Sequence, residues 1–205
     1  MKYRPHKYQQ YAKNFIMEHP VCCLMLDMGL GKTVITLSAL WELVLDCFDI
    51  GKILVIAPKR VATDTWPKEL QKWEHLTGLT ASLVVGSQKQ REEALTRPAF
   101  VYIINRENVS WLVQNHRWDF DTVVIDELSS FKSNKAERFK ALKKVRPLVN
   151  RVIGLTGTPA PNSLLDLWPQ MYLLDMGQRL GRFITGYRER FFKPDKRNRE
   201  IIYSY

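Results

Sequence analysis

Short, continuous apolar runs recur along this chain of 205 residues. They lie at residues 21–26, 53–57, 81–85, 100–104, 122–125 and 152–155. Apolar side chains that do not alternate with polar ones indicate strands buried on both faces, as in a parallel sheet covered by helices. Segments of helical character separate most of these runs, at residues 8–19, 32–48, 66–76, 88–95 and 135–145. The sequence therefore predicts an α/β fold with a mostly parallel central sheet flanked by helices.

The chain is basic, with 31 Lys and Arg against 21 Asp and Glu. Such a surplus attracts polyanions, so nucleic acid is the partner class that the charge favours, although solubility alone explains many basic surfaces. An apolar content of 45% excludes a disordered or collagen-like chain. No apolar run approaches the roughly 20 residues of a membrane span, so no membrane partner is expected. The three cysteines show no metal-binding or redox spacing, which favours a reducing, intracellular environment.

A glycine-rich segment follows the first apolar run and precedes a predicted helix. It reads Asp-Met-Gly-Leu-Gly-Lys-Thr over residues 27–33, and we call it the phosphate loop. Its glycines allow the backbone N–H groups to face a polyphosphate, and the helix N-terminus adds its dipole. Lys32 is predicted to reach the β and γ phosphates and the Thr33 hydroxyl to hold magnesium. The predicted nucleotide-binding residues of this loop are Met28, Gly29, Leu30, Gly31, Lys32 and Thr33.

The loop departs from the full phosphate-loop pattern at its first position, where Leu26 stands in place of glycine. A glycine-rich strand-to-helix turn that carries a surface lysine is the alternative interpretation.

An acidic pair, Asp126 and Glu127, directly follows the fifth apolar run. A nucleotide hydrolase needs one carboxylate for the metal and another to activate water, and these predicted roles fall to Asp126 and Glu127 respectively. A plain strand cap is the alternative.

A third segment, Leu-Thr-Gly-Thr-Pro over residues 155–159, ends the last run with two hydroxyls around a glycine. Such a turn could donate hydrogen bonds to the acidic pair and respond to the γ-phosphate.

In this order, the motifs resemble those of the first motor domain of superfamily-two helicases, in particular the Swi/Snf branch of double-stranded-DNA translocases. The phosphate loop is similar to that branch's loop almost letter for letter. Residues 4–9 resemble its adenine-reading segment, with Gln9 in the glutamine position. Residues 56–59, followed by Trp66 and Glu69, resemble a motif that contacts a DNA strand. Residues 161–168 and 183–192 resemble the helical stretch that leads toward a second motor domain.

The resemblance implies a RecA-like P-loop domain over residues 1–192 and a basic tail over residues 193–205. It implies ATP and magnesium as ligands, Gln9 as the adenine-selecting residue, and Lys32, Asp126 and Glu127 as catalytic residues. Thr156, Gly157 and Thr158 take the place of the family's coupling motif. The family's Asp-Glu-x-His has Ser129 where the histidine stands, so Ser129 is expected to bridge to the coupling motif without carrying charge.

The resemblance also implies double-stranded DNA and a second RecA-like domain as partners. No such domain fits in the 46 residues that follow Pro159, so we expect the chain to be a fragment or to borrow the other half from a partner. It would then be inactive or weak alone, because the second domain supplies the transition-state arginine. The alternatives are a strand-separating helicase of the same superfamily, a nucleotide-gated DNA-binding module without turnover and, last, a small P-loop kinase.

Three basic residues are the expected DNA contacts: Lys59, Arg60 and Arg106. They follow the second and fourth predicted strands, whose ends share one edge of a parallel sheet. Trp41, Leu45 and Phe48 fall on one helix face and are expected in the core, and Trp66 and Trp73 are expected to pack against the sheet. The compact spacing of the motifs favours a bacterial or viral protein that acts in the cytoplasm, whereas a eukaryotic one would be nuclear.

Overall fold

A single parallel sheet organises the chain, of which the computed structural model describes residues 1–160, 162–193, 196–198 and 201–204. Its six strands lie in the order β1-β6-β5-β2-β4-β3, and every neighbouring pair is parallel. The strands are β1 (Val21–Met25), β2 (Ile53–Ala57), β3 (Ala81–Val84), β4 (Val101–Asn105), β5 (Thr122–Asp126) and β6 (Arg151–Thr156). Two further strands, β7 (Lys196–Asn198) and β8 (Ile201–Ser204), form a separate antiparallel pair.

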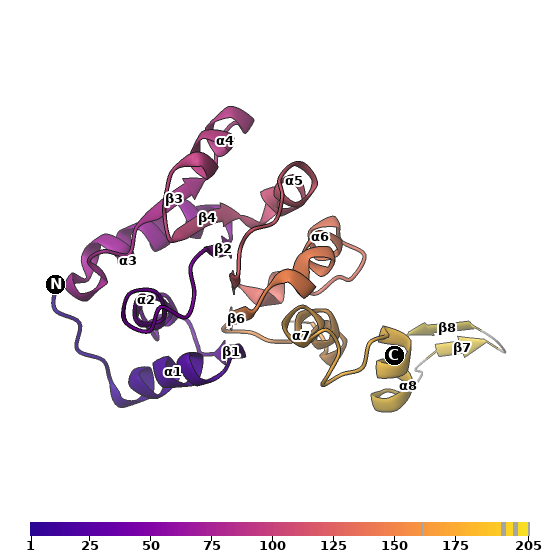
Figure 1. Ribbon diagram of the computed structural model, residues 1–205. Coiled ribbons are helices and arrows are strands. Elements are labelled where there is room, and N and C mark those ends of the chain that lie inside the picture. Colours follow the sequence, from indigo (N-terminus) through magenta and orange to yellow (C-terminus); the bar gives the residue numbers. More distant parts are fainter. Residues whose placement is uncertain (161, 194–195, 199–200, 205) are drawn as a thin grey trace.

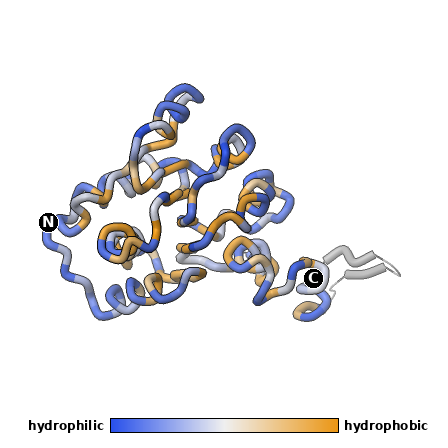
Figure 2. The backbone as a smooth tube through the Cα atoms, in the orientation of Figure 1, coloured by the Kyte–Doolittle hydropathy of each residue, from blue (hydrophilic) through white to orange (hydrophobic). Residues whose placement is uncertain are grey.

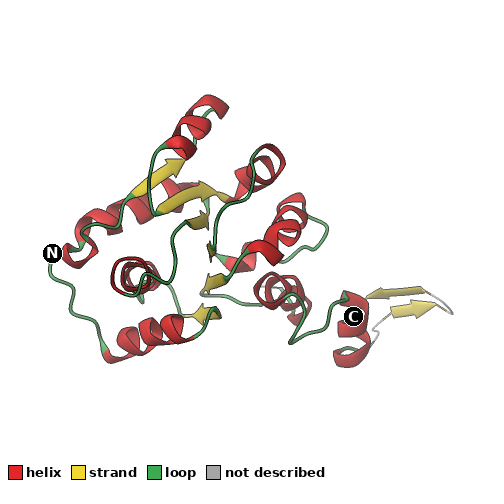
Figure 3. Ribbon diagram, viewed as in Figure 1, coloured by secondary structure: helices red, strands yellow, loops and turns green. Residues whose placement is uncertain are grey.

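Helices cover both faces of this sheet (Figure 1). The α-helices of the described residues are α1 (Lys7–Glu18), α2 (Lys32–Trp41), α3 (Trp66–Lys72), α4 (Gln88–Thr96), α5 (Val109–Asn115), α6 (Glu137–Val145), α7 (Leu167–Asp175) and α8 (Ile184–Phe191), of which α8 lies beyond α7, away from the sheet. The first three pack on one face, and α5, α6 and α7 pack on the other. Figure 3 shows these helices as two layers with the strands between them. The predicted α/β class and the mostly parallel sheet are therefore confirmed.

The central strands carry the continuous burial that the apolar runs predicted. All residues of β2, β4, β5 and β6 are buried, and Figure 2 shows the hydrophobic segments concentrated between the helical layers. The edge strand β3 departs from the prediction, because its burial alternates and Leu83 is exposed. The reason is that α4 covers only one face of this strand, where Ser82 donates a hydrogen bond to the carbonyl of Ala94.

The predicted helix over residues 32–48 differs from the observed structure at its C-terminal end. The α-helix stops at Trp41 and continues as a π-helix over Glu42–Asp46. Phe48 then adopts a left-handed conformation and is 82% exposed, so its predicted place in the core is wrong. Trp41 is half-buried and its Nε1 donates to the Thr77 carbonyl at 2.9 Å. Helix α5 was not among the predicted helices.

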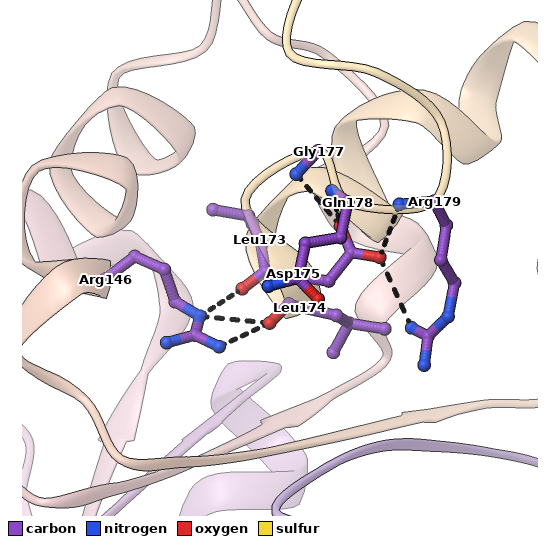
Figure 4. Close-up of polar contacts among 7 residues, drawn as sticks. All are labelled: Arg146, Leu173, Leu174, Asp175, Gly177, Gln178 and Arg179. Carbon is purple, nitrogen blue, oxygen red and sulfur yellow. Dashed lines mark hydrogen bonds and ion pairs between the residues drawn. The ribbon is translucent and has the colours of Figure 1, made fainter.

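The C-terminal end of α7 is held by a buried arginine (Figure 4). The Arg146 guanidinium donates to the carbonyls of Leu173 at 2.8 Å, Leu174 at 3.1 Å and Val149 at 2.9 Å. The last carbonyls of a helix lack intrahelical partners, and a cation there also complements the helix dipole. Burial lowers the pKa of Arg146, and the nearby Asp175 carboxylate opposes that shift. This contact ties α7 to the turn that follows α6.

Removing the Arg146 donors should destabilise the fold. We expect Arg146→Met, which keeps an apolar stem but leaves buried carbonyls unpaired, to lower the free energy of unfolding by about 2–3 kcal/mol in urea titrations. Arg179→Ala is the matched control, because that half-exposed arginine pairs with Asp175 at the same end of α7 and should cost less than about 1 kcal/mol. Equal losses for the two variants would contradict the anchoring role of Arg146.

The three thiols differ in environment: Cys22 is buried, Cys23 is half-buried and Cys47 is exposed. Burial raises the pKa of Cys22 to about 11 and that of Cys23 to about 12. The thiolate is the reactive form, so a raised pKa suppresses reaction at pH 8. We expect Ellman's reagent to titrate one thiol rapidly in the native protein and all three in guanidinium. Rapid reaction of a second native thiol would contradict the described packing of β1.

Within the described ranges, no helix is both long and apolar enough to cross a lipid bilayer.

Candidate functional site

The phosphate loop connects the end of β1 to the start of α2. Gly29 and Gly31 have φ values of 82° and 80°, a left-handed conformation that side chains with a Cβ rarely adopt. Gly31 is also the N-cap of α2, and a Cβ there would lie 2.7 Å from Nε2 of Gln9. Nζ of Lys32 donates to the carbonyls of Leu26 at 2.7 Å and Asp27 at 3.1 Å. The predicted strand–loop–helix geometry is thus present, with the lysine folded back over the loop.

Gln9 lies in the first turn of α1 and reaches the phosphate loop. It is 8% exposed, and its Nε2 donates to the Leu30 carbonyl at 3.4 Å while its Oε1 accepts the His6 backbone N–H at 3.0 Å. The Tyr8 hydroxyl donates to the same Leu30 carbonyl at 3.2 Å. These bonds join the N-terminal segment to the loop, so the predicted adenine-side residue and the predicted phosphate site form one unit. The adenine-selecting role of Gln9 stays a prediction.

The acidic pair stands at the C-terminal end of β5, two strands away from β1. Asp126 is 7% exposed, and its Oδ1 accepts the Glu127 backbone N–H at 3.0 Å. Its Oδ2 accepts Nε1–H of Trp66 at 2.9 Å. Burial raises the pKa of Asp126. The hydrogen bonds from Trp66 and from the Glu127 backbone N–H and the charge of Lys32 oppose that shift, while the charge of Glu127 reinforces it. Without those donors, a carboxylate in this place would be costly to keep ionised.

Glu127 adopts a left-handed conformation with φ of 54°, which is strained for a residue with a side chain. The turn that follows holds it: the Ser130 N–H donates to the Glu127 carbonyl at 2.8 Å, and the Ser129 hydroxyl donates to Oε2 of Glu127 at 3.4 Å. Ser129 therefore contacts the predicted water-activating carboxylate.

A single cleft of about 830 Å³ joins these elements. Its lining includes Gln9, Lys32, Thr33, Asp126 and Glu127, and it extends over the N-terminal residues and along α3. The volume falls in the range of sites that hold a nucleotide-sized ligand. Residues from four separate parts of the sequence, within 1–9, 28–34, 61–73 and 126–127, thus meet in one site at the carboxyl edge of the sheet, where parallel α/β folds bind ligands.

The turn over residues 155–159, which we call the coupling turn, differs from its predicted contacts. The Thr158 N–H donates to Oγ1 of Thr156 at 3.1 Å, so one of the two hydroxyls stabilises the turn itself. Gly157 packs against the phosphate loop, where an added Cβ would lie 3.4 Å from the Leu26 carbonyl and 3.7 Å from the Met28 nitrogen. The hydrogen bond described for the Ser129 hydroxyl goes to Glu127 and not to this turn. The contact that the geometry supports for the turn is therefore with the loop.

The predicted DNA-contact residues lie at the same edge of the sheet as the cleft but differ in their exposure and in their ion pairs. Lys59 and Arg60 follow β2 and are exposed, so their charges are available to a phosphate backbone. Arg106 follows β4, is half-buried, and its Nε donates to Oε1 of Glu107 at 3.0 Å. A phosphate contact by Arg106 would require exchange of that ion pair. Their role in DNA binding stays a prediction.

Two residues at the site were not predicted from the sequence. Trp66, expected to pack against the sheet and part of the motif that resembles a DNA contact, bonds the Asp126 carboxylate instead of serving the packing alone. Gln170 of α7 is 1% exposed, and its Nε2 donates to the Pro159 carbonyl at 2.7 Å, which ties α7 to the end of the coupling turn. Trp66 could have been found, because the segment Trp-Pro-Lys-Glu at 66–69 belongs to a recognisable motif. No local sequence pattern distinguishes Gln170.

Comparison with known proteins places this geometry in a family. Residues 8–191 match the SNF2-related domain. The chain is 40% identical over 199 residues to a protein named p41 of Acyrthosiphon pisum secondary endosymbiont phage 1, covering 93% of this chain and 43% of the phage protein. It is 30% identical over 196 residues to Helicase SWR1 of Saccharomyces cerevisiae, covering 89% of this chain and 12% of the helicase.

The fold is also that of a solved structure, the Sulfolobus solfataricus SWI2/SNF2 ATPase core in complex with dsDNA. The TM-score is 0.80 at 23% identity, over 95% of this chain and 40% of that chain. The present chain thus spans less than half the length of each of these relatives. Because the family match takes in most of the chain, the chain belongs to the SNF2-related family, as the N-terminal RecA-like domain of a superfamily-two, Swi/Snf-like motor.

Proposed function

We propose that this chain is the ATP-binding and ATP-hydrolysing first motor domain of a double-stranded-DNA translocase. The observation that carries the proposal is the shared cleft, in which the phosphate loop, Gln9 and the acidic pair meet. Such a set of groups holds a nucleotide and positions water for attack on its terminal phosphate. The solved relative that shares the fold is described as a complex with dsDNA, which supports duplex DNA as the partner.

The residues present fit magnesium as well as ATP. The Asp126 carboxylate and the Thr33 hydroxyl both line the cleft, and hard oxygen ligands of this kind suit magnesium, which keeps further phosphate and water ligands. When bound, magnesium would neutralise charge on the β and γ phosphates. Asp126 would hold its coordination shell from the end of β5, and Thr33 would do so from the first turn of α2.

The remaining groups would act on the nucleotide directly. Lys32 would leave the loop carbonyls that it now contacts and bond the β and γ phosphate oxygens, while the loop N–H groups face the phosphates. Glu127 would accept a proton from the attacking water. A second RecA-like domain, which the greater length of the relatives supports, would close over the cleft and supply the transition-state arginine.

Removal of the phosphate-binding charge tests the nucleotide site. We expect Lys32→Ala to weaken ATP binding by about 30- to 100-fold, which corresponds to the loss of charge-assisted bonds of about 2–3 kcal/mol. Isothermal titration calorimetry with magnesium and ATP measures this. Lys140→Ala is the matched control, because this exposed lysine pairs with Glu137 on α6 and should leave the affinity unchanged. Equal affinities of Lys32→Ala and wild type would exclude the proposed phosphate contact.

Hydrolysis tests the motor function. Steady-state ATP turnover is measured without nucleic acid, with single strands and with duplex, on this chain alone and on the motor that includes the second domain. We expect the chain alone to bind ATP with negligible turnover, and the complete motor to be stimulated by duplex. Glu127→Gln should keep ATP affinity and lower that stimulated turnover by at least about 100-fold, as loss of a general base does.

Other outcomes separate the alternatives. Unwinding of a tailed duplex by the complete motor would indicate a strand-separating helicase, and duplex binding that depends on ATP without turnover would indicate a nucleotide-gated binding module. Normal turnover by Glu127→Gln would show that another group activates the water. Turnover by the chain alone with duplex would show that it completes its own site.

A further inference from the structure

The indole of Trp66 reaches across the sheet edge to the acidic pair. Trp66 is fully buried, and its Nε1–H donates to Oδ2 of Asp126 at 2.9 Å over a sequence separation of 60 residues. Packing alone does not require this bond, because a buried indole N–H needs only one acceptor and backbone carbonyls serve elsewhere in this chain. Here the acceptor is the carboxylate that the proposed function assigns to magnesium.

The direction of the indole depends on an irregular helical turn. Residues Val61–Thr65 form a π-helix directly before α3, and the Trp66 N–H donates to the Val61 carbonyl across five residues. Pro67 follows at the start of α3 and has no N–H to donate. Each residue turns an α-helix by about 100°, so the extra residue in this turn decides whether the indole faces Asp126. Single π-turns are frequent at functional sites.

The protein thereby holds both oxygens of Asp126. Oδ1 accepts the backbone N–H of Glu127 at 3.0 Å, and Oδ2 accepts the indole N–H of Trp66. Neither donor titrates near neutral pH, and each oxygen keeps a further lone pair. The carboxylate is therefore fixed in rotation while it remains able to accept from a metal-bound water or to bind a metal.

We propose that Trp66 is a positioning residue that orients the Asp126 carboxylate for the magnesium–nucleotide complex. It joins that carboxylate to the helical segment that begins at Lys59 and Arg60, the predicted DNA contacts. The inference rests on the proposed function, since it acts through the metal carboxylate. Partners that orient metal ligands in this way affect affinity for the metal more than affinity for the rest of the ligand.

The test compares binding of adenylyl imidodiphosphate, a non-hydrolysable ATP analogue, in magnesium and in EDTA. We expect Trp66→Phe to weaken binding about 10- to 100-fold in magnesium and to leave binding in EDTA unchanged. Trp118→Phe is the matched control, because its Nε1 donates to the Phe120 carbonyl at 2.9 Å just before β5, at the end of that strand opposite Asp126. It should change neither affinity. Equal weakening by Trp66→Phe in both buffers would show a merely structural role and overturn the proposal.

A double-mutant cycle separates this inference from the proposed function. In the Asp126→Asn background, adding Trp66→Phe should change the affinity in magnesium by less than about twofold, since the two residues act as one unit. A full effect of Trp66→Phe in that background would overturn the positioning role. If Asp126→Asn itself left the magnesium dependence unchanged, the proposed metal carboxylate would be wrong, whatever Trp66 does.

A second measurement applies even if Trp66→Phe fails to fold. The chain has six tryptophans, and their indole N–H resonances can be assigned and followed by ¹⁵N NMR. We expect the Trp66 indole resonance to shift in Asp126→Asn, and to shift on addition of the analogue with magnesium but not with EDTA. The Trp118 indole resonance should stay constant in all three conditions. A Trp66 resonance that is insensitive to both changes would overturn the proposal.

Discussion

The parallel register of β1, β6 and β5 is the constraint on which the site depends. Met25 lies opposite Thr156, and Asp126 lies opposite Leu155. Because all three strands run in the same direction, the phosphate loop, the coupling turn and the acidic pair leave the sheet side by side. A slip of one residue would move a strand by about 3.3 Å and send each of its side chains to the other face. The buried apolar residues on both faces of β5 and β6 oppose such a slip, so the core defines the geometry of the cleft.

A buried carboxylate at that edge imposes a second requirement. Asp126 loses most of its water, so its charge must be compensated by donors that the fold provides. One donor is the backbone N–H of Glu127, a residue that adopts a left-handed conformation. The other donor is the indole N–H of Trp66, from helix α3 on the face of the sheet that α1 and α2 also cover. The strained conformation of Glu127 and the π-helix before α3 thus both occur next to a residue that donates a hydrogen bond to the Asp126 carboxylate.

The elements that could be predicted from the sequence are those with local signals. Buried parallel strands show as continuous apolar runs, and the phosphate loop shows through the glycines that its left-handed residues need. The failures have causes that the apolar pattern does not record. Leu83 is exposed because its strand lies at an edge that helices cover on one face only. Phe48 leaves the core because a π-turn ends the 3.6-residue periodicity before it.

The residues of the candidate site divide in the same way, into those with a local sequence signal and those without one. Lys32 and Asp126 could be found because the phosphate loop and the acidic pair each follow an apolar run directly, at the sheet edge where parallel folds bind ligands. The bond from Trp66 to Asp126 could not be found in this way, since it joins two elements 60 residues apart. It also requires the π-turn before α3, which no pattern of hydrophobic residues reveals.

The coupling turn shows how a departure from the family pattern can be accommodated. Ser129, in place of the family's histidine, bonds Glu127 and leaves the turn to other contacts. An added Cβ at Gly157 would lie 3.4 Å from the Leu26 carbonyl, so the turn packs against the phosphate loop where only glycine leaves room to spare. Gln170 then bonds the Pro159 carbonyl from α7, whose far end Arg146 holds. The contacts from loop to turn to α7 are therefore packing and neutral hydrogen bonds, and none of them involves a charged side chain at position 129.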